Sequence, residues 1–265
     1  MIYNAKESTI NALGMKFEYI SLGSGDKPLI MIQGLNTRGI KGTALFFAYM
    51  YRIFAKEYTV YLFERRPLVK EGLSVRDMAS DIAAVMDVLG IANADVIGVS
   101  QGGMIAQYLV IDRPDLVRKL VLTVTLSRNN DTVIQVVNRW IKMVEMGEMK
   151  EFVRDMAEKM YSGAYMKRYR LFMPLLTKLQ KPKDIQRFVI LAKACLTCNT
   201  YELLGQIKCP VFVLGGKHDK VVTGFASEEI AEKIGCKIHM YGNLGHAVYE
   251  EAGDFKKIVY DFLRE

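Results

Sequence analysis

Residues 94–103 read Ala-Asp-Val-Ile-Gly-Val-Ser-Gln-Gly-Gly, and this stretch decides the fold. Apart from Asp95, the first six residues form a short apolar run, as in a strand of a parallel sheet. Residues 101–111 then have helical spacing, which stops before Pro114. The motif Gly-x-Ser-x-Gly lies between them, where a sharp turn can hold a serine hydroxyl above the edge of a sheet. We therefore expect Ser100 to be a nucleophile.

The same alternation of apolar strand and helix extends outward on both sides of this stretch. The predicted strands are residues 8–13, 15–21, 28–32, 58–63, 94–99, 117–124, 211–214 and 237–241, and the predicted helices between them are 43–55, 74–89, 101–111, 225–234 and 255–263. Gly14 marks a tight turn between the first two strands. Strand–helix–strand units of this kind form a parallel sheet with helices on both faces, so the predicted fold class is α/β.

The alternation stops between about residues 127 and 204. This stretch is helical throughout, with helices predicted near residues 131–146, 149–161, 166–179 and 183–195. We interpret residues 127–204 as an inserted helical cap. Residues 1–126 and 205–265 are then the two parts of one core domain.

The chain has 265 residues, of which 51% are hydrophobic, so it can bury a large core. No apolar leader run opens it, and no stretch reaches the roughly 18 apolar residues of a membrane-spanning helix. We expect a soluble, cytoplasmic protein that spans no membrane.

The positive charge is concentrated in the predicted cap. Residues 127–204 hold 14 Lys and Arg against 8 Asp and Glu, which is +6 of the total net charge of +7. Basic stripes with interleaved aromatic residues are absent from the sequence, so we expect no nucleic-acid partner. A solvated lysine-rich surface is the common meaning of such charge, and an anionic substrate or an acidic partner at the cap is the alternative.

Four cysteines are present, at positions 195, 198, 209 and 236. Cys195 and Cys198 form a Cys-x-x-Cys pair, which occurs in redox sites and zinc sites. A redox site normally lies at the start of a βαβ unit, and a zinc site needs a second pair of ligands nearby. Neither context is present, so we interpret all four as free thiols and expect no metal.

A serine hydroxyl needs a general base, and the base needs an acid that orients it. Among the three histidines, His246 follows the strand 237–241 at its carboxyl end, where open α/β sheets gather their active residues. Asp219 likewise follows the strand 211–214. We expect His246 to be the base and Asp219 to fix its tautomer. Packing or surface roles fit His218 and His239 better.

The oxyanion that forms during such a reaction needs backbone N–H donors. One predicted donor is the amide of Gln101, at the start of a helix. The second is the amide of Leu35, which follows the strand 28–32, and Gly34 lets this loop approach closely. Gly98 and Gly102 support the serine turn because they lack side chains that would clash.

Together these motifs resemble those of the α/β-hydrolase superfamily, specifically its lidded esterase and lactonase-like members. The resemblance spans nearly the whole chain and rests on residues 98–103 (Gly-Val-Ser-Gln-Gly-Gly), 215–222 (Gly-Gly-Lys-His-Asp-Lys-Val-Val) and 245–250 (Gly-His-Ala-Val-Tyr-Glu). It implies an eight-stranded, mostly parallel sheet, a helical cap over the site, and no cofactor.

The chain departs from the family pattern at two places. Gln33-Gly34 stands where the family usually has His-Gly, and Glu64-Arg65-Arg66-Pro67 stands where it has a turn like Asp-x-Arg-Gly. The first change leaves the backbone donor available and alters the hydrogen bonds around it.

The expected activity is hydrolysis of a carboxylic ester of a small or medium acyl or aryl substrate through an acyl-enzyme. The same three residues could cleave a lactone, a thioester or a C–C bond beside a carbonyl, and a non-catalytic ligand-binding member of the fold is a further alternative. The pocket is expected to draw on apolar cap residues, most of which belong to the cap core. These residues are Trp140, Met143, Met146, Met156, Met160, Tyr161, Tyr165, Phe172 and Met173.

Overall fold

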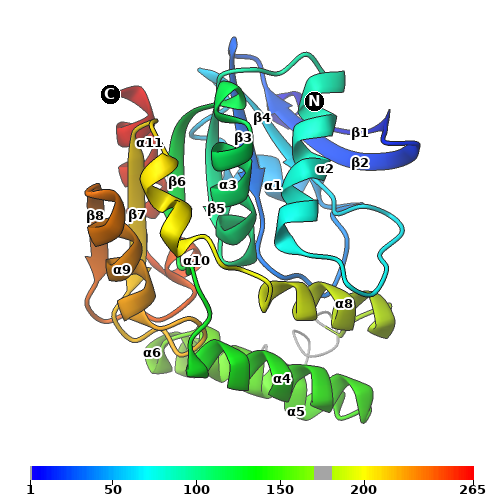
Figure 1. The fold of residues 1–265 in the computed structure, drawn as a ribbon, viewed down its shortest axis with the longest axis vertical. Helices are drawn as coiled ribbons and strands as arrows, with labels where there is room; N and C mark the ends of the chain where they lie inside the picture. The colour runs from blue at the N-terminus through cyan, green and yellow to red at the C-terminus, as the bar shows by residue number, and fades with distance from the viewer. Residues whose placement is uncertain (1, 170–180) are drawn as a thin grey trace.

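A twisted eight-stranded sheet forms the centre of the computed structural model, which describes residues 2–169 and 181–265 (Figure 1). The strands are β1 (Lys6–Ala12), β2 (Met15–Gly23), β3 (Lys27–Ile32), β4 (Tyr58–Phe63), β5 (Ala94–Val99), β6 (Val117–Thr123), β7 (Val211–Gly216) and β8 (Lys237–Tyr241). Their order is β1-β2-β4-β3-β5-β6-β7-β8. β2 pairs antiparallel with both β1 and β4, and every other pair is parallel. The predicted α/β fold with a mostly parallel sheet is confirmed.

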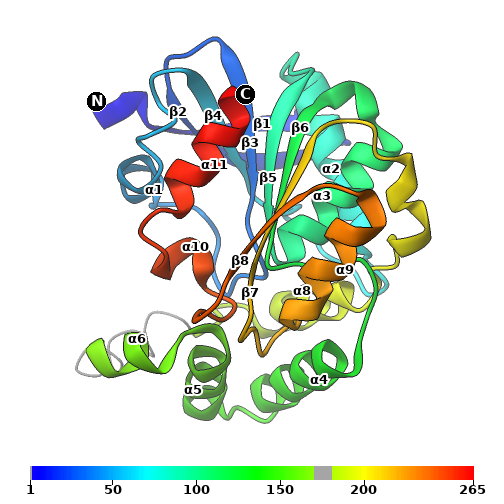
Figure 2. The ribbon, with the colours of Figure 1, turned by 90° about the vertical axis from the view of Figure 1, so that its left-hand side faces the viewer.

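Helices cover both faces of this sheet (Figure 2). One face carries α2 (Val75–Val88), α3 (Gln101–Asp112) and α9 (Gly224–Ile234), and the other carries α1 (Ala44–Met50), α10 (Val248–Glu251) and α11 (Phe255–Arg264). Each layer has its own apolar core against the sheet. The central strands read as continuous apolar runs because both of their faces are buried.

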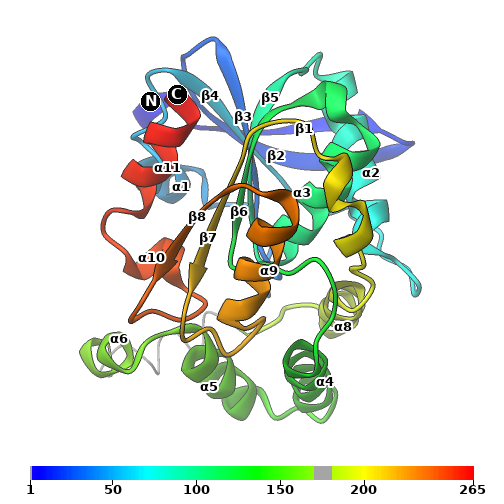
Figure 3. The same ribbon diagram turned by 60° about the vertical axis from the view of Figure 1, so that its left-hand side comes forward.

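Among the described residues, four further α-helices lie between β6 and β7 in the chain. They are α4 (Asp131–Glu145), α5 (Met149–Met160), α6 (Gly163–Arg168) and α8 (Ile185–Cys195). Figure 3 shows α4, α5 and α6 beyond the carboxyl ends of the strands, on the side where β5 passes into α3. They are therefore placed over the edge of the sheet at which the candidate site lies.

Side-chain caps explain where two of these helices begin. The helix predicted at 166–179 starts earlier, at Gly163, because the Ser162 side chain accepts a hydrogen bond from the Tyr165 amide. The rest of that prediction falls largely on residues 170–180, which lie outside the described residues. α8 starts at Ile185, two residues later than predicted, because Asp184 caps it.

The described residues also include three short 3₁₀ helices: η1 (Ile2–Asn4), η2 (Pro114–Leu116) and η4 (Tyr201–Gln206). Across the two described ranges, no helix has both the length and the apolar character needed to cross a bilayer.

Candidate active site

Ser100 occupies the turn between β5 and α3 with a backbone φ of 54° and ψ of −120°. A positive φ is strained for any residue with a side chain, so neighbouring groups must hold the turn in place. The Ser100 amide donates to the Thr123 carbonyl at 2.9 Å, and Thr125 Oγ1 donates to the Ser100 carbonyl at 2.8 Å. These bonds fix the backbone on both sides of the serine hydroxyl.

The glycines predicted to support this turn are closely surrounded. A Cβ at Gly102 would lie 1.9 Å from the Ile32 carbonyl oxygen, and one at Gly98 would lie 2.6 Å from the Gly102 carbonyl oxygen. A Cβ at Gly34 would lie 3.2 Å from the Cβ of Ser100. Since larger residues would push these segments apart, the close approach of β3, β5 and α3 depends on glycine.

Ser100, His246 and Asp219 come together although they are far apart in the sequence. His246 Nε2 lies 2.9 Å from Ser100 Oγ, and His246 Nδ1 lies 2.8 Å from Asp219 Oδ2. Both His246 and Asp219 are buried, at 3% and 7% exposure. With its proton on Nδ1, the imidazole donates to Asp219 and accepts from the serine hydroxyl, as nucleophilic catalysis by serine requires.

Backbone groups hold both partners of the serine. Asp219 Oδ1 accepts from the amides of Val221 at 2.7 Å and Val222 at 3.0 Å, which leaves Oδ2 for the imidazole. Next to His246, the Ala247 amide donates to the Met160 carbonyl at 2.9 Å, at the end of α5. The histidine loop is therefore tied to a helix from residues 127–204.

The other two histidines lie elsewhere, as expected. The His218 side chain is exposed. His239 packs edge-on against Tyr241, with ring centroids 4.5 Å apart.

The two predicted oxyanion donors flank this group of residues. Gln101 is the first residue of α3, and Leu35 follows β3 in the loop beside Ser100. Counting only partners among the described residues, neither the Leu35 amide nor the Gln101 amide donates a hydrogen bond. Both backbone N–H groups are thus available to a bound oxygen.

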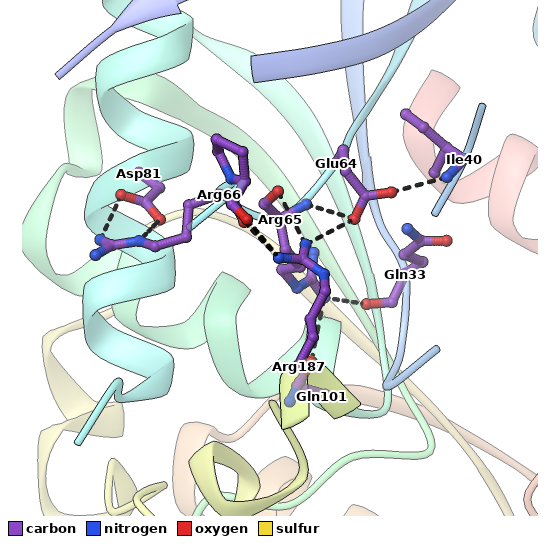
Figure 4. Close-up of polar contacts among 9 residues, drawn as sticks. Gln33, Ile40, Glu64, Arg65, Arg66, Asp81, Gln101 and Arg187 are labelled. Atoms are coloured by element: carbon purple, nitrogen blue, oxygen red, sulfur yellow. Dashed lines mark hydrogen bonds and ion pairs between the residues drawn. The ribbon is translucent and has the colours of Figure 1, made fainter. Parts of the chain in front are cut away.

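A cluster of charged side chains behind the oxyanion loop was not predicted from the sequence (Figure 4). Arg65 follows Glu64, the first residue after β4. It is buried, at 5% exposure. Its Nη2 donates to the Gln33 carbonyl at 2.6 Å. Burial lowers the pKa of Arg65 to about 10, so it is still a cation at neutral pH.

A cleft of about 460 Å³ begins beside Ser100. Gly34, Leu35 and Val99 form its end near the serine, and the cleft continues between α1, α5 and α10. Its lining is mostly aromatic and aliphatic, as is common in small-molecule sites. The apolar residues that line it farther from the serine include Phe46, Phe47, Tyr51, Phe54, Met156, Met160, Tyr161 and Tyr249.

The apolar residues considered for the pocket divide between several environments. Met156, Met160 and Tyr161 line the cleft. Trp140 is buried and donates to Asp155 at 2.8 Å, whereas Met146 is exposed. Met143 packs against the core, and Tyr165 lies between the rings of Tyr161 and Tyr169. Phe172 and Met173 lie outside the described residues.

One carboxylate lines this cleft. Glu250, in α10, accepts a hydrogen bond from the Tyr161 hydroxyl at 2.7 Å. Glu250 is exposed overall, but desolvation of its carboxylate raises its pKa; the Tyr161 hydrogen bond opposes this shift and the nearby Glu251 adds to it. Arg38 is the cation among the described lining residues.

The four cysteines are free thiols in this structure. Cys195 and Cys198 are buried, and their burial raises the thiol pKa to about 11 and about 12. Cys195 Sγ accepts from Gln101 Nε2 at 3.1 Å. Within the described ranges, no group of three His, Cys, Asp or Glu side chains is arranged to hold a metal ion.

Comparison with known proteins shows which family and which relatives this chain is similar to. The family model described as the alpha/beta hydrolase fold matches residues 27–155. A curated relative, 2-hydroxy-6-oxononadienedioate/2-hydroxy-6-oxononatrienedioate hydrolase 2 of Pseudomonas putida, is 25% identical over 95% of this chain and 93% of its own length. A hydrolase of the same name, without the number, from Pseudomonas sp is 26% identical over 91% and 89%.

Solved structures agree over the whole fold. The enol-lactonase from Burkholderia xenovorans LB400 superposes with a TM-score of 0.85 at 20% identity, covering 97% of this chain and 100% of its own. MGS-M2, an alpha/beta hydrolase enzyme from a Medee basin deep-sea metagenome library, has a TM-score of 0.85 at 18% identity over 97% and 98%. The chain therefore has the α/β-hydrolase fold, and the relatives that match it over nearly its whole length are hydrolases.

Proposed function

We propose that this α/β-hydrolase is a serine hydrolase that cleaves a carboxylic ester of a small or medium acyl or aryl substrate. The observation that supports the proposal best is the continuous chain of hydrogen bonds from Ser100 Oγ through His246 to Asp219. It begins next to a largely apolar cleft, which suits an acyl or aryl group.

In the proposed reaction, Ser100 Oγ attacks the carbonyl carbon of the ester while His246 Nε2 accepts the hydroxyl proton. Asp219 stabilises the resulting imidazolium. The C–O bond to the alcohol then breaks, and His246 gives its proton to the leaving oxygen. Water, deprotonated by His246, attacks the acyl-enzyme, and the acid leaves as Ser100 regains its proton.

The amides of Leu35 and Gln101 stabilise the tetrahedral intermediate in this scheme. Donors fixed in place before the reaction are favourable because no reorganisation is needed as charge develops on the oxygen. We propose that residues 127–204 act as the cap that closes the cleft, with 1–126 and 205–265 as the core, and that the protein acts in the cytoplasm without a cofactor.

A second candidate is cleavage of a C–C bond beside a carbonyl by the same residues. The support is the similarity to the two Pseudomonas hydrolases over at least 91% of this chain. The substrates in their names carry a ketone and two carboxylates but no ester, so their hydrolysis breaks a C–C bond. The retained Ser, His and Asp argue against the non-catalytic alternative.

A substrate panel separates these candidates. Purified protein is assayed with p-nitrophenyl esters of two to eight carbons, with lactones and with a 2-hydroxy-6-oxo-dienedioate, each beside the Ser100→Ala variant. We expect turnover of the short and medium esters by the wild type and loss of about 10³-fold or more in the variant. Turnover of the dienedioate without turnover of any ester would replace the ester proposal with the C–C one.

A further inference from the structure

The two places where the chain departs from the family pattern meet in space (Figure 4). Arg65 Nη2, from the turn after β4, donates to the carbonyl of Gln33 at 2.6 Å. The same nitrogen lies 3.5 Å from the side-chain oxygen of Gln101. One buried guanidinium therefore contacts the loop after β3 and the first residue of α3.

These two contacts adjoin the two proposed oxyanion donors. Gln33 lies two residues before Leu35, in the loop after β3. Gln101 provides the second amide itself, and its side-chain nitrogen donates to the Leu191 carbonyl of α8 at 2.7 Å. Arg65 thus contacts both donor segments, and it is not among the described residues that line the cleft.

The neighbouring carboxylate anchors the other end of the same loop. Glu64 Oε2 accepts from the Ile40 amide at 2.7 Å, and Glu64 Oε1 lies 3.6 Å from Arg187 Nη2 of α8. Arg187 Nη2 also donates to the Arg65 carbonyl at 3.2 Å. Residues 33–40 are therefore fixed at both ends by the dipeptide Glu64-Arg65, which is itself fixed from α8.

A buried cation in this place has a cost that its contacts must offset. Removing a guanidinium from water is unfavourable unless its N–H groups find acceptors, and Arg65 Nε has no partner among the described residues. An apolar residue would avoid that cost but would leave the partly buried Gln33 carbonyl without this donor. The arrangement is therefore more consistent with a geometric requirement than with stability alone.

We propose that Arg65 is a positioning residue that holds the Leu35 and Gln101 amides at the separation required by the tetrahedral intermediate. The proposal rests on the proposed serine-hydrolase function. It assigns no contact between Arg65 and the substrate. Replacing Arg65 should therefore slow the steps that use the oxyanion donors and should not weaken ground-state binding of the substrate.

The test compares Arg65→Met and Arg65→Lys with the matched control Arg66→Met. Arg66 is the adjacent arginine, and it pairs with Asp81 at 2.6 Å away from both donor segments. Three quantities are measured: the rate of labelling by a fluorophosphonate, kcat and KM for p-nitrophenyl acetate, and inhibition by a trifluoromethyl ketone. The ketone forms an oxyanion on the enzyme, so its affinity reports on the donors.

For Arg65→Met we expect labelling and kcat to fall about 10- to 100-fold, because small displacements of catalytic groups have effects of this order. Affinity for the ketone should fall in parallel, while KM changes less than about threefold. Arg65→Lys keeps the charge but not the planar fork, so its losses should be intermediate. Arg66→Met should stay within about threefold of wild type in all three.

A folded Arg65→Met variant with wild-type labelling and ketone affinity would overturn the positioning role and leave the proposed function intact. If Arg65→Met does not fold, two other single variants take its place: Arg65→Lys and Gln101→Met, of which the second removes the contacted side-chain oxygen. Wild-type labelling and ketone affinity in both would overturn the positioning role equally. Failure of the wild type to be labelled at Ser100 would instead overturn the proposed function, and the positioning role with it.

Discussion

At the scale of single residues, the clearest feature is the backbone of Ser100, whose φ of 54° suits glycine better than serine. Such strain costs on the order of 1–3 kcal/mol and is typical of functional sites. The chain has a serine here although glycine would adopt this backbone conformation with less strain. The hydroxyl is therefore retained at the expense of stability.

This strain predicts that Ser100→Gly is more stable than Ser100→Ala by about 1 kcal/mol, because only glycine relieves it. Both variants lack the hydroxyl and should be equally inactive, so the comparison isolates the backbone. Urea denaturation of the two variants measures the difference in the free energy of unfolding. An alanine variant as stable as the glycine variant would mean that the turn is unstrained.

The position of Glu250 predicts selectivity against ester substrates that carry a free carboxylate at their other end. Its carboxylate lines the cleft, and a like charge brought close to it is repelled by roughly 1–2 kcal/mol. We expect wild type to prefer p-nitrophenyl hexanoate over the mono-p-nitrophenyl ester of adipic acid, and Glu250→Gln to raise kcat/KM for the adipate ester about tenfold. The assay is run at pH 8, since partial desolvation raises the pKa of Glu250 and a higher pH keeps its carboxylate ionised.

Glu251→Gln is the matched control for this change. Glu251 carries the same charge one residue away, but it accepts from the amide of Ser162 at 2.9 Å. An equal gain on the adipate ester from both variants would show a general charge effect and would remove Glu250 as a selective group.

At the scale of elements, the sequence predicts α4 and α5 to within one residue, but it misses the starts of α6 and α8, and α1 ends five residues earlier than predicted. The bounds of β5 and β8 agree with the prediction because each is a short run between clear turn residues. α10 was missed, since four residues carry no periodicity. Helix starts at Gly163 and Ile185 depend on capping bonds, which the apolar spacing does not reveal.

The candidate site likewise contains residues that the sequence predicts and a residue that it does not. Ser100, Asp219 and His246 could be found because each follows a strand at its carboxyl end, and strand ends are visible in the sequence. Arg65 could not be found in this way. Its contact with Gln33 joins residues 32 positions apart, and an arginine in a turn after a strand is normally exposed.

The burial of Cys195, the last residue of α8, and of Cys198, three residues later, makes a prediction about these two thiols. Burial raises the thiol pKa of Cys195 to about 11 and of Cys198 to about 12, so both stay protonated and unreactive at pH 7.5. Iodoacetamide should alkylate them at least 100-fold more slowly in the folded protein than in urea. Rapid alkylation of the native protein, read by peptide mass spectrometry, would revive a redox role for this pair.

At the scale of the whole molecule, the charge is separated along the chain. Residues 127–204 hold +6 of the net +7, and the helices among them lie beyond the carboxyl ends of the strands. Charge near the entrance of a site can raise the local concentration of oppositely charged ligands, and salt screens this effect. We therefore propose that these helices attract an anionic substrate or an acidic partner, and the salt dependence of activity tests this.

If this charge recruits anionic substrates, kcat/KM for an anionic ester should fall about fivefold or more between 20 and 500 mM NaCl, as screening removes the long-range attraction. A neutral ester of the same length should change little over that range. Equal salt dependence of the two esters would mean that the basic helices act only as a solvated surface.

The central claim is that Ser100 is a nucleophile activated by His246 and Asp219. Fluorophosphonate labelling followed by peptide mass spectrometry tests it most directly. We expect one label per chain, located on Ser100, absent in Ser100→Ala and slowed at least about 10³-fold in His246→Ala. Labelling that survives in Ser100→Ala, or that maps to another residue in the wild type, would contradict it.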